Sequence, residues 1–299
     1  MTPELCLGTA QFGLNYGVTN SDGQVDKIEI QNILAAAATN DISYLDTAQA
    51  YGEAESLLGS CKPKNFSFRI ASKLPAQPNN LWGIERQDIW EKAFQQTLRN
   101  LQVSNIDSFF LHNADDLKYP NRNFLLDWLL SLQDRKLVRR IGVSIYCASD
   151  LEGLPLSLFQ IVQLPLSIYD QRLLLDGTIS KLSKAGIAIH ARSVFLQGLI
   201  LQSHLNWPLF LSQQFKHHHA ACELEAKANN LNMLDVALKF LRDVDQLEAV
   251  IVGVTKTSEF AAIIKSWLAP ISRLEVFPFY ANWSWENHSD LDPRSWPSR

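Results

Sequence analysis

The sequence has few of the residues that mark several classes of protein. It contains only 4 cysteines among 299 residues, and Cys6, Cys61, Cys147 and Cys222 nowhere form a C-x-x-C pair. Scattered cysteines are typical of reduced thiols, so they argue against a disulfide framework and against a zinc site. Positive charge is also scarce, because 27 Lys and Arg face 31 Asp and Glu, giving a formal net charge of −4. A broad nucleic-acid-binding surface is therefore not expected.

Long apolar runs are missing as well. No stretch approaches the roughly 20 apolar residues that a membrane-spanning helix needs. The first residues, Met1–Glu4, lack the basic and apolar regions of a secretion signal. We therefore expect a cytoplasmic protein with no membrane contact. The composition, 46% hydrophobic and 19% charged, is that of an ordinary globular protein with enough material for a large core.

Short apolar runs alternate with helix-like segments along the chain. The runs are nearly continuous, as expected for strands that are covered on both faces. We expect eight strands, at Leu5–Thr9, Tyr44–Thr47, Phe68–Lys73, Ile106–Leu111, Arg140–Ser144, Ile161–Leu164, Ala188–Ser193 and Ala249–Val252. Apolar spacing at i, i+3 and i+4 predicts helices between them, at 26–38, 86–102, Phe124–Lys136, Gly177–Ala185, His217–Asn230 and Ser258–Leu268. At the start of the first helix, Asp26 and Glu29 have the spacing of a capping box, with Asp in place of Ser or Thr.

Eight strands alternating with helices favour a (β/α)8 TIM barrel in a single α/β domain. That domain would span residues 1–299, with a C-terminal tail of about 270–299 packed on the barrel. The competing fold is a doubly wound open sheet, which usually carries a G-x-G-x-x-G turn after its first strand. The glycines of the segment Gly8–Gly13 do not have this spacing. The sequence therefore favours the barrel over the open sheet.

Four polar residues follow the ends of three successive expected strands. They are Asp46 and Tyr51, then Lys73, then His112. In a parallel barrel these ends open on one face, which is where active sites lie. A phenol serves as a general acid if its pKa is lowered, and a nearby ammonium group lowers it. Lys73 would then lower the pKa of Tyr51, Asp46 would pair with Lys73, and His112 would hydrogen bond a substrate oxygen. Since none of these is a nucleophile–base pair or a metal site, a hydride carrier would supply the reductant.

Five segments in this order resemble the aldo-keto reductase superfamily, and the resemblance extends from Leu5 to about Ser266. They are Leu7–Gly13 (LGTAQFG), Tyr44–Ala48 with Tyr51–Gly52, Ala71–Lys73, Phe110–Asn113 and Ile141–Ser144. The resemblance implies a (β/α)8 barrel, an oxidoreductase that reduces carbonyl compounds with NADPH, and a catalytic tetrad of Asp46, Tyr51, Lys73 and His112. Tyr51 would be its proton donor. The LGTAQFG opening is similar to a bacterial-type subgroup associated with sugar pathways, so a sugar-derived carbonyl is one option for the substrate.

The resemblance also implies where the cofactor lies. Ser144 and Gln163 fall where the family binds the nicotinamide carboxamide. Arg192 stands where the family often stacks an aromatic side chain on the nicotinamide, and a planar guanidinium can also stack on a ring. The full set of implied cofactor-binding residues is Gly8, Thr9, Ser144, Gln163, Arg192, Ser193, Phe195, Gln197, Gly198, Gly253, Val254, Thr255 and Lys256.

The segment Ile251–Thr257 resembles the part of the family that binds the adenosine 2′-phosphate. A helix beginning there would offer free N–H groups, and Lys256 would add a positive charge. The segment departs from the family pattern at Thr255, where an Arg is common, and at Ile263, where an Asn is common. We expect NADPH in preference to NADH, a small-molecule carbonyl substrate, and a monomer or weak homo-oligomer.

Two other functions remain open from the sequence. The chain could be a sensing or regulatory subunit that binds the cofactor with little turnover. It could also dehydrogenate or epimerise a sugar nucleotide with a cofactor that it never releases. A metal site is not expected, because the adjacent His217, His218 and His219 would point about 100° apart on a helix. We expect these histidines to lie on a solvated helix face.

Overall fold

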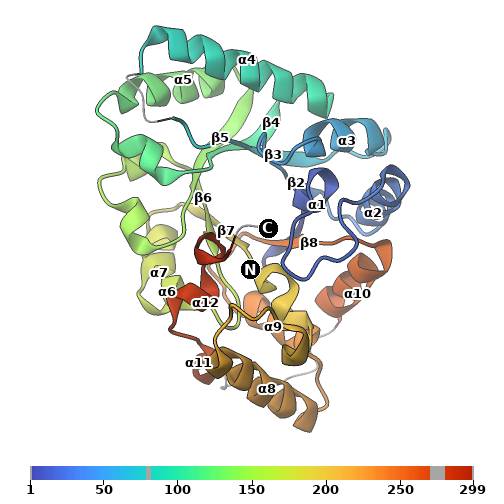
Figure 1. Ribbon diagram of the computed structural model, residues 1–299. Coiled ribbons are helices and arrows are strands. Elements are labelled where there is room, and N and C mark those ends of the chain that lie inside the picture. The colour runs from blue at the N-terminus through green and yellow to red at the C-terminus, as the bar shows by residue number, and fades with distance from the viewer. Residues whose placement is uncertain (1, 79–81, 270–279, 298–299) are drawn as a thin grey trace.

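The computed structural model describes residues 2–78, 82–269 and 280–297, and it is a closed barrel of eight parallel strands. Figure 1 shows the strands in the middle of the molecule and the helices around them. The strands pair in sequence order from β1 to β8, and β8 closes the barrel against β1. The predicted single-domain TIM barrel is therefore confirmed, and the open sheet is excluded.

All eight expected strands are present, with ends that shift by a residue or two. Their bounds are β1 Glu4–Gly8, β2 Tyr44–Asp46, β3 Arg69–Leu74, β4 Ile106–Leu111, β5 Val138–Ser144, β6 Ile161–Pro165, β7 Ala188–Arg192 and β8 Ala249–Gly253. The strands are almost entirely buried, because side chains fill the barrel on one face and helices cover the other. This burial explains why they read as continuous apolar runs in the sequence.

The helices surround the barrel. The longer ones are α2 Lys27–Thr39, α3 Ala54–Cys61, α4 Ile84–Leu101, α5 Arg122–Asp134, α7 Thr178–Lys184, α8 Gln213–Ala228, α9 Met233–Arg242 and α10 Thr257–Leu268. The short ones are α1 Ala10–Gly13, α6 Arg172–Leu175, α11 Tyr280–Trp283 and α12 His288–Leu291. The sequence did not predict the short helices, and among the longer ones it did not predict α3 and α9. The signal for α9 was available, because Val236, Ala237, Phe240 and Leu241 recur at helical spacing and are buried.

The start of α2 differs from the expected capping box. The Asp26 side chain accepts hydrogen bonds from the backbone N–H groups of Ile28 and Glu29, as an N-cap residue should. Glu29 does not complete the box, because its carboxylate accepts a hydrogen bond from the backbone N–H of Thr257. Glu29 therefore links the starts of α2 and α10, which lie side by side at one edge of the barrel (Figure 1).

A buried polar network closes the amino-terminal end of the barrel. The Arg140 guanidinium lies 2.9 Å from Asp107 and 2.7 Å from Glu248. The Tyr44 hydroxyl donates to Asp107 at 2.8 Å, and His190 Nε2 lies 3.0 Å from Glu248. Although burial raises the pKa of both carboxyl groups, hydrogen bonds and the Arg140 charge lower it by more: Ser108, Tyr44 and Arg140 act on Asp107, and His190 and Arg140 act on Glu248. Each buried charge is paired, as its low-dielectric surroundings require.

The tail from residue 280 to 297 packs on the outside of α8. The Trp283 indole donates to Glu225 at 2.8 Å, and Asp290 accepts from the backbone and hydroxyl of Ser212 at 2.9 and 2.7 Å. The rest of the predicted tail, 270–279 and 298–299, lies outside the described residues. Beneath the tail, His219 is fully buried and its Nδ1 lies 2.6 Å from the Tyr169 hydroxyl. The expectation of a solvated face is therefore wrong for His219, because the tail and the β7–α8 connection cover that side of α8.

None of the helices within the described segments is long and apolar enough to cross a membrane. In the same segments, no group of three His, Cys, Asp or Glu side chains is placed to hold a metal ion.

We expect the network at the closed end to stabilise the fold strongly. Arg140→Met would leave the buried Asp107 and the partly exposed Glu248 without their shared cation, so the free energy of unfolding should fall by about 3–5 kcal/mol. The matched control is Arg139→Met, because the Arg139 side chain is 60% exposed although it also contacts Asp107. The control should cost ~0–1 kcal/mol. Urea unfolding of the two variants measures this difference, and equal losses would contradict the role of Arg140.

Candidate active site

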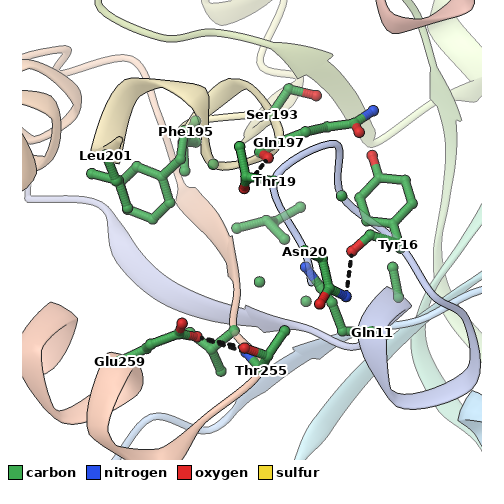
Figure 2. Close-up of a pocket in the computed structure, with 18 of the residues that line it drawn as sticks. Gln11, Tyr16, Thr19, Asn20, Ser193, Phe195, Gln197, Leu201, Thr255 and Glu259 are labelled. Atoms are coloured by element: carbon green, nitrogen blue, oxygen red, sulfur yellow. Dashed lines mark hydrogen bonds between the residues drawn. The ribbon is translucent and has the colours of Figure 1, made fainter. Parts of the chain in front are cut away.

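A cavity of about 1000 Å³ opens at the carboxyl end of the barrel. It is at the upper end of the usual size of small-molecule sites, about 300–1,000 Å³. The loops after β1, β7 and β8 form its walls, together with the facing ends of α8, α9 and α10. Figure 2 shows part of this cavity, with Tyr16 and Asn20 on one side and Phe195 and Leu201 on another. It runs from the strand-end polar residues to the start of α10.

A buried ion pair lies at the bottom of the cavity. Lys73 Nζ donates to Asp46 Oδ2 at 2.6 Å and to the backbone carbonyl of Thr47 at 2.8 Å. Lys73 is fully buried and Asp46 is 4% exposed. Both come from strand ends that the register of the sheet brings together, because β2 pairs with β3 up to Asp46. A buried lysine stays charged only if a partner compensates the loss of water, and Asp46 is that partner.

Two further residues fix the position of Asp46. Gln163 Nε2 donates to Asp46 Oδ1 at 2.8 Å, so each oxygen of the carboxylate has its own donor. Thr9 donates to the backbone carbonyl of Asp46 through its N–H at 2.9 Å and its hydroxyl at 3.0 Å. Both residues are buried and both line the cavity. Gln163 was predicted to bind the nicotinamide carboxamide, which stays a prediction, and its amide nitrogen supports the Asp46 carboxylate.

Tyr51 lies above the ion pair and beside His112. The two rings meet edge to face with centroids 5.8 Å apart, and Lys73 Nζ lies 5.1 Å from the centroid of the Tyr51 ring. Burial and the Asp46 carboxylate raise the pKa of the Tyr51 phenol, and Arg192 opposes this rise. Burial is the largest of these contributions, so the pKa of Tyr51 is raised overall, and the lowering by Lys73 stays a prediction. Tyr51 therefore keeps its proton at neutral pH, as a proton donor must.

His112 is a neutral imidazole in the same place. Burial lowers its pKa to about 4, and the charges of Lys73 and Arg192 act in the same direction. A neutral imidazole has one N–H donor and one acceptor nitrogen. His112 can therefore donate a hydrogen bond to a substrate oxygen without bringing a full positive charge into the site.

Arg192 lies across the cavity wall at the end of β7. Its guanidinium carbon is 4.0 Å from the centroid of the Tyr146 ring, and its Nη2 donates to the carbonyl of Ile145 at 3.0 Å. Its Nε lies 3.4 Å from the Ser144 hydroxyl. Arg294, from the C-terminal tail, also packs on Tyr146, at 3.7 Å from the ring centroid. Stacking of Arg192 on a nicotinamide ring stays a prediction, although the guanidinium already stacks on an aromatic ring.

The loop after β7 is held against the loop after β1. Gln197 Oε1 accepts a hydrogen bond from the backbone N–H of Val18 at 2.9 Å, and the Gln197 carbonyl accepts from the Thr19 hydroxyl at 2.9 Å (Figure 2). Gln197 has a positive φ of 54°, and Gly198 follows with a φ of 92°. A Cβ atom on Gly198 would lie 2.0 Å from the Thr19 hydroxyl oxygen, so only glycine fits. Such backbone strain is often found at binding sites.

Most of the predicted site residues come together around this cavity. Of the predicted tetrad, Asp46, Tyr51 and His112 line it, and Lys73 lies directly beneath. Of the predicted cofactor residues, all line it except Ser144, which lies under Arg192, and Lys256, which faces an adjoining hollow. These residues also share a position in the fold, because they lie at the carboxyl ends of strands or in the loops that follow.

Sequence analysis missed several residues that line the cavity. They come from loops and helix starts far from the tetrad in sequence, and they include Tyr16, Asn20, Tyr146, Asn232 and Glu259. The periodic spacing of apolar residues predicts helices, but it does not predict which loops fold back over the cavity. For Glu259 a signal was present, since an acidic residue three positions after a helix start is typical of a capping box.

The model of the aldo/keto reductase family matches residues 4–276. This chain belongs to the aldo/keto reductase family. It is an oxidoreductase of that family, whose members generally use NAD(P)H and act on small carbonyl substrates. No curated protein matches it significantly.

Two solved structures illustrate the shared fold. The holo form of an aldo-keto reductase from Bacillus halodurans is 18% identical, with a TM-score of 0.75, and the match covers 94% of this chain and 92% of that one. The glycerol dehydrogenase of Gluconobacter oxydans is 20% identical, with a TM-score of 0.68, and the match covers 88% and 86% of the two chains. At this identity the likeness shows the fold alone.

The depressed pKa of His112 should be visible in solution. The ordinary histidine pKa is 6.5 and the folded value is about 4, so the unfolded chain takes up this proton more readily. The stability that neutral His112 contributes is therefore complete above pH 6.5 and is lost as the pH falls through about 4. An NMR titration of the histidine ring signals, with His112→Gln to assign the signal, should place its midpoint near 4. A midpoint at or above 6.5 would contradict the neutral imidazole.

Proposed function

We propose that this protein reduces an aldehyde or ketone to an alcohol with a reduced nicotinamide dinucleotide. The observation that carries the proposal is the buried Lys73–Asp46 pair beneath a protonated Tyr51, with neutral His112 beside it at the bottom of a large cavity. Tyr51 would be a proton donor, His112 a hydrogen-bond donor and Lys73 a fixed cation, and the three lie together at the bottom of the cavity. The set matches the chemistry of adding a hydride to carbon and a proton to oxygen.

Each residue of the tetrad has a distinct part in the proposed reaction. The cofactor, when bound, supplies the hydride that adds to the carbonyl carbon. His112 donates a hydrogen bond to the carbonyl oxygen and so fixes its direction. As negative charge develops on that oxygen, the Tyr51 hydroxyl transfers its proton to it, and the product is an alcohol. The phenolate that remains is stabilised by the two nearby cations, Lys73 and Arg192.

The remaining residues of the cavity fit a dinucleotide. The cavity extends well beyond the tetrad, along the tight turn at Gln197 and Gly198 to Gly253 at the end of β8. We propose that Ser144 and Gln163 hold the nicotinamide end, and that the segment from Ser193 to Gly198 lies along the pyrophosphate. At the far end of the cavity, the N–H groups that were predicted to bind a 2′-phosphate already donate to carboxylates. The preference for NADPH stays a prediction, and the contacts at α10 argue against it. A sugar-derived substrate likewise stays a prediction.

The role of Tyr51 is tested by removing its hydroxyl. Tyr51→Phe should lower kcat/KM for the NAD(P)H-dependent reduction of an activated aromatic aldehyde by roughly 10²- to 10⁴-fold, because the proton donor is lost. Cofactor affinity, measured by quenching of tryptophan fluorescence, should change little. The matched control is Tyr16→Phe, which removes a phenol from the same cavity but not from the tetrad.

Two outcomes would contradict the assignment. Equal losses in Tyr51→Phe and Tyr16→Phe would show that the phenol of Tyr51 has no special part. Tight cofactor binding with no multiple turnover in the unmodified protein would favour a sensing subunit or a reaction with retained cofactor.

A further inference from the structure

At the far end of the cavity, carboxylates already accept hydrogen bonds from the start of α10. Glu259 Oε2 accepts hydrogen bonds from the Thr255 N–H at 2.8 Å, the Thr255 hydroxyl at 3.1 Å and the Lys256 N–H at 3.2 Å. The next N–H along the chain, that of Thr257, donates to Glu29. Figure 2 shows Glu259 turned towards Thr255 at the edge of the cavity. Three successive N–H groups at this helix start therefore already have acidic partners.

These are the groups that a phosphate would use. A helix N-terminus attracts an anion because its first N–H groups are free and its dipole is positive there. Here Glu259 and Glu29 already accept from the N–H groups of Thr255, Lys256 and Thr257, and they place negative charge at the positive end of the dipole. A 2′-phosphate, nearly doubly charged at neutral pH, would reach the N–H groups of Thr255 and Lys256 only if Glu259 released its three hydrogen bonds and moved its charge away.

The surrounding charges act in the same direction. Lys256, which was predicted to contact the 2′-phosphate, pairs with Asp22 at 2.9 Å. Asp26 and Glu29 line the adjoining hollow together with Asp22 and Lys256. From α8, one acidic and one basic residue also line the cavity, Glu223 and Lys227. The described residues around this end thus carry more carboxylates than ammonium groups, and a further anion would be repelled.

A ribose with free hydroxyl groups has the complementary chemistry. Its 2′- and 3′-hydroxyls are hydrogen-bond donors, and a carboxylate is an acceptor with several lone pairs. Glu259 lines the cavity, and its Oε1 has no hydrogen-bond partner among the described residues. The helix start holds the other oxygen, so the side chain is already oriented before a ligand arrives.

We propose that this protein binds the nicotinamide cofactor that lacks the 2′-phosphate, NADH, and that Glu259 selects it by accepting hydrogen bonds from the adenosine ribose and repelling a 2′-phosphate. The proposal rests on the proposed function, since it assumes that the cavity holds a nicotinamide dinucleotide. It replaces the preference for NADPH that the sequence suggested. Glu259 becomes a residue that determines cofactor specificity.

Equilibrium binding tests this without relying on turnover. The dissociation constants of NADH and NADPH would be measured by calorimetry with the unmodified protein, Glu259→Gln and Glu85→Gln. Gln keeps the shape and one acceptor oxygen but removes the charge. Glu85 is the matched control, because it also lies in the first turn of a helix, α4, and is exposed, but it does not line the cavity.

The unmodified protein should bind NADH roughly 10- to 100-fold more tightly than NADPH, as expected for a few hydrogen bonds to a charged group. Glu259→Gln should reduce this ratio by about 10-fold or more, mainly by strengthening NADPH binding, and Glu85→Gln should leave it unchanged. Adenosine 5′-diphosphate should likewise bind more tightly than its 2′-phosphorylated analogue.

Three results would overturn the proposal. Tighter binding of NADPH than of NADH by the unmodified protein would refute it and leave carbonyl reduction intact. The same ratio in Glu259→Gln and the unmodified protein would show that Glu259 does not select the cofactor. Failure of both cofactors to bind would remove the proposed function together with this inference.

Discussion

The buried pair of Lys73 and Asp46 is the interaction on which the rest of the site depends. It joins the ends of β2 and β3 inside the barrel, and Gln163 and Thr9 tie the same aspartate to β6 and β1. An ammonium group without water needs such a partner, and the carboxylate needs its donors in turn. The two charges therefore fix four strand ends in one arrangement. The cavity above them has a rigid bottom because neither charge can move without leaving the other unpaired.

Burial, together with the charges of this pair, sets the protonation of the groups above it. The pKa of the Tyr51 phenol and that of the His112 imidazole are shifted first by burial, and then by Asp46 and by Lys73 respectively. Burial disfavours the charged form of each group, so both stay neutral, and both can donate a hydrogen bond or a proton. Arg192, which lies on Tyr146 at the cavity wall, opposes the rise in the pKa of Tyr51. In the proposed reaction Tyr51 would hold a proton at rest, and Lys73 and Arg192 would stabilise the phenolate that the transfer of this proton leaves behind.

Sequence reasoning located the fold and most of the site because strand ends are visible in the chain. Asp46, Lys73 and His112 each follow a short apolar run, and a parallel barrel places all such ends on one face. What it could not show depends on contacts between distant parts of the chain. The hydrogen bond between Gln163 and Asp46 spans 117 residues, and the contact of Glu29 with Thr257 spans 228. The local pattern at α10 predicted free N–H groups, and only the folded chain reveals the two carboxylates that accept from those of Thr255, Lys256 and Thr257.

The central claim is that hydride is added to a carbonyl carbon in this cavity, and isotope transfer tests it most directly. The protein would be incubated with an activated aromatic aldehyde and NADH or NADPH deuterated at the transferable position of the nicotinamide C4. The account predicts one deuterium on the carbinol carbon of the alcohol product, found by mass spectrometry and NMR, with none at that carbon when only the solvent is deuterated. Deuterium from solvent at that carbon, or no alcohol with either cofactor, would contradict it.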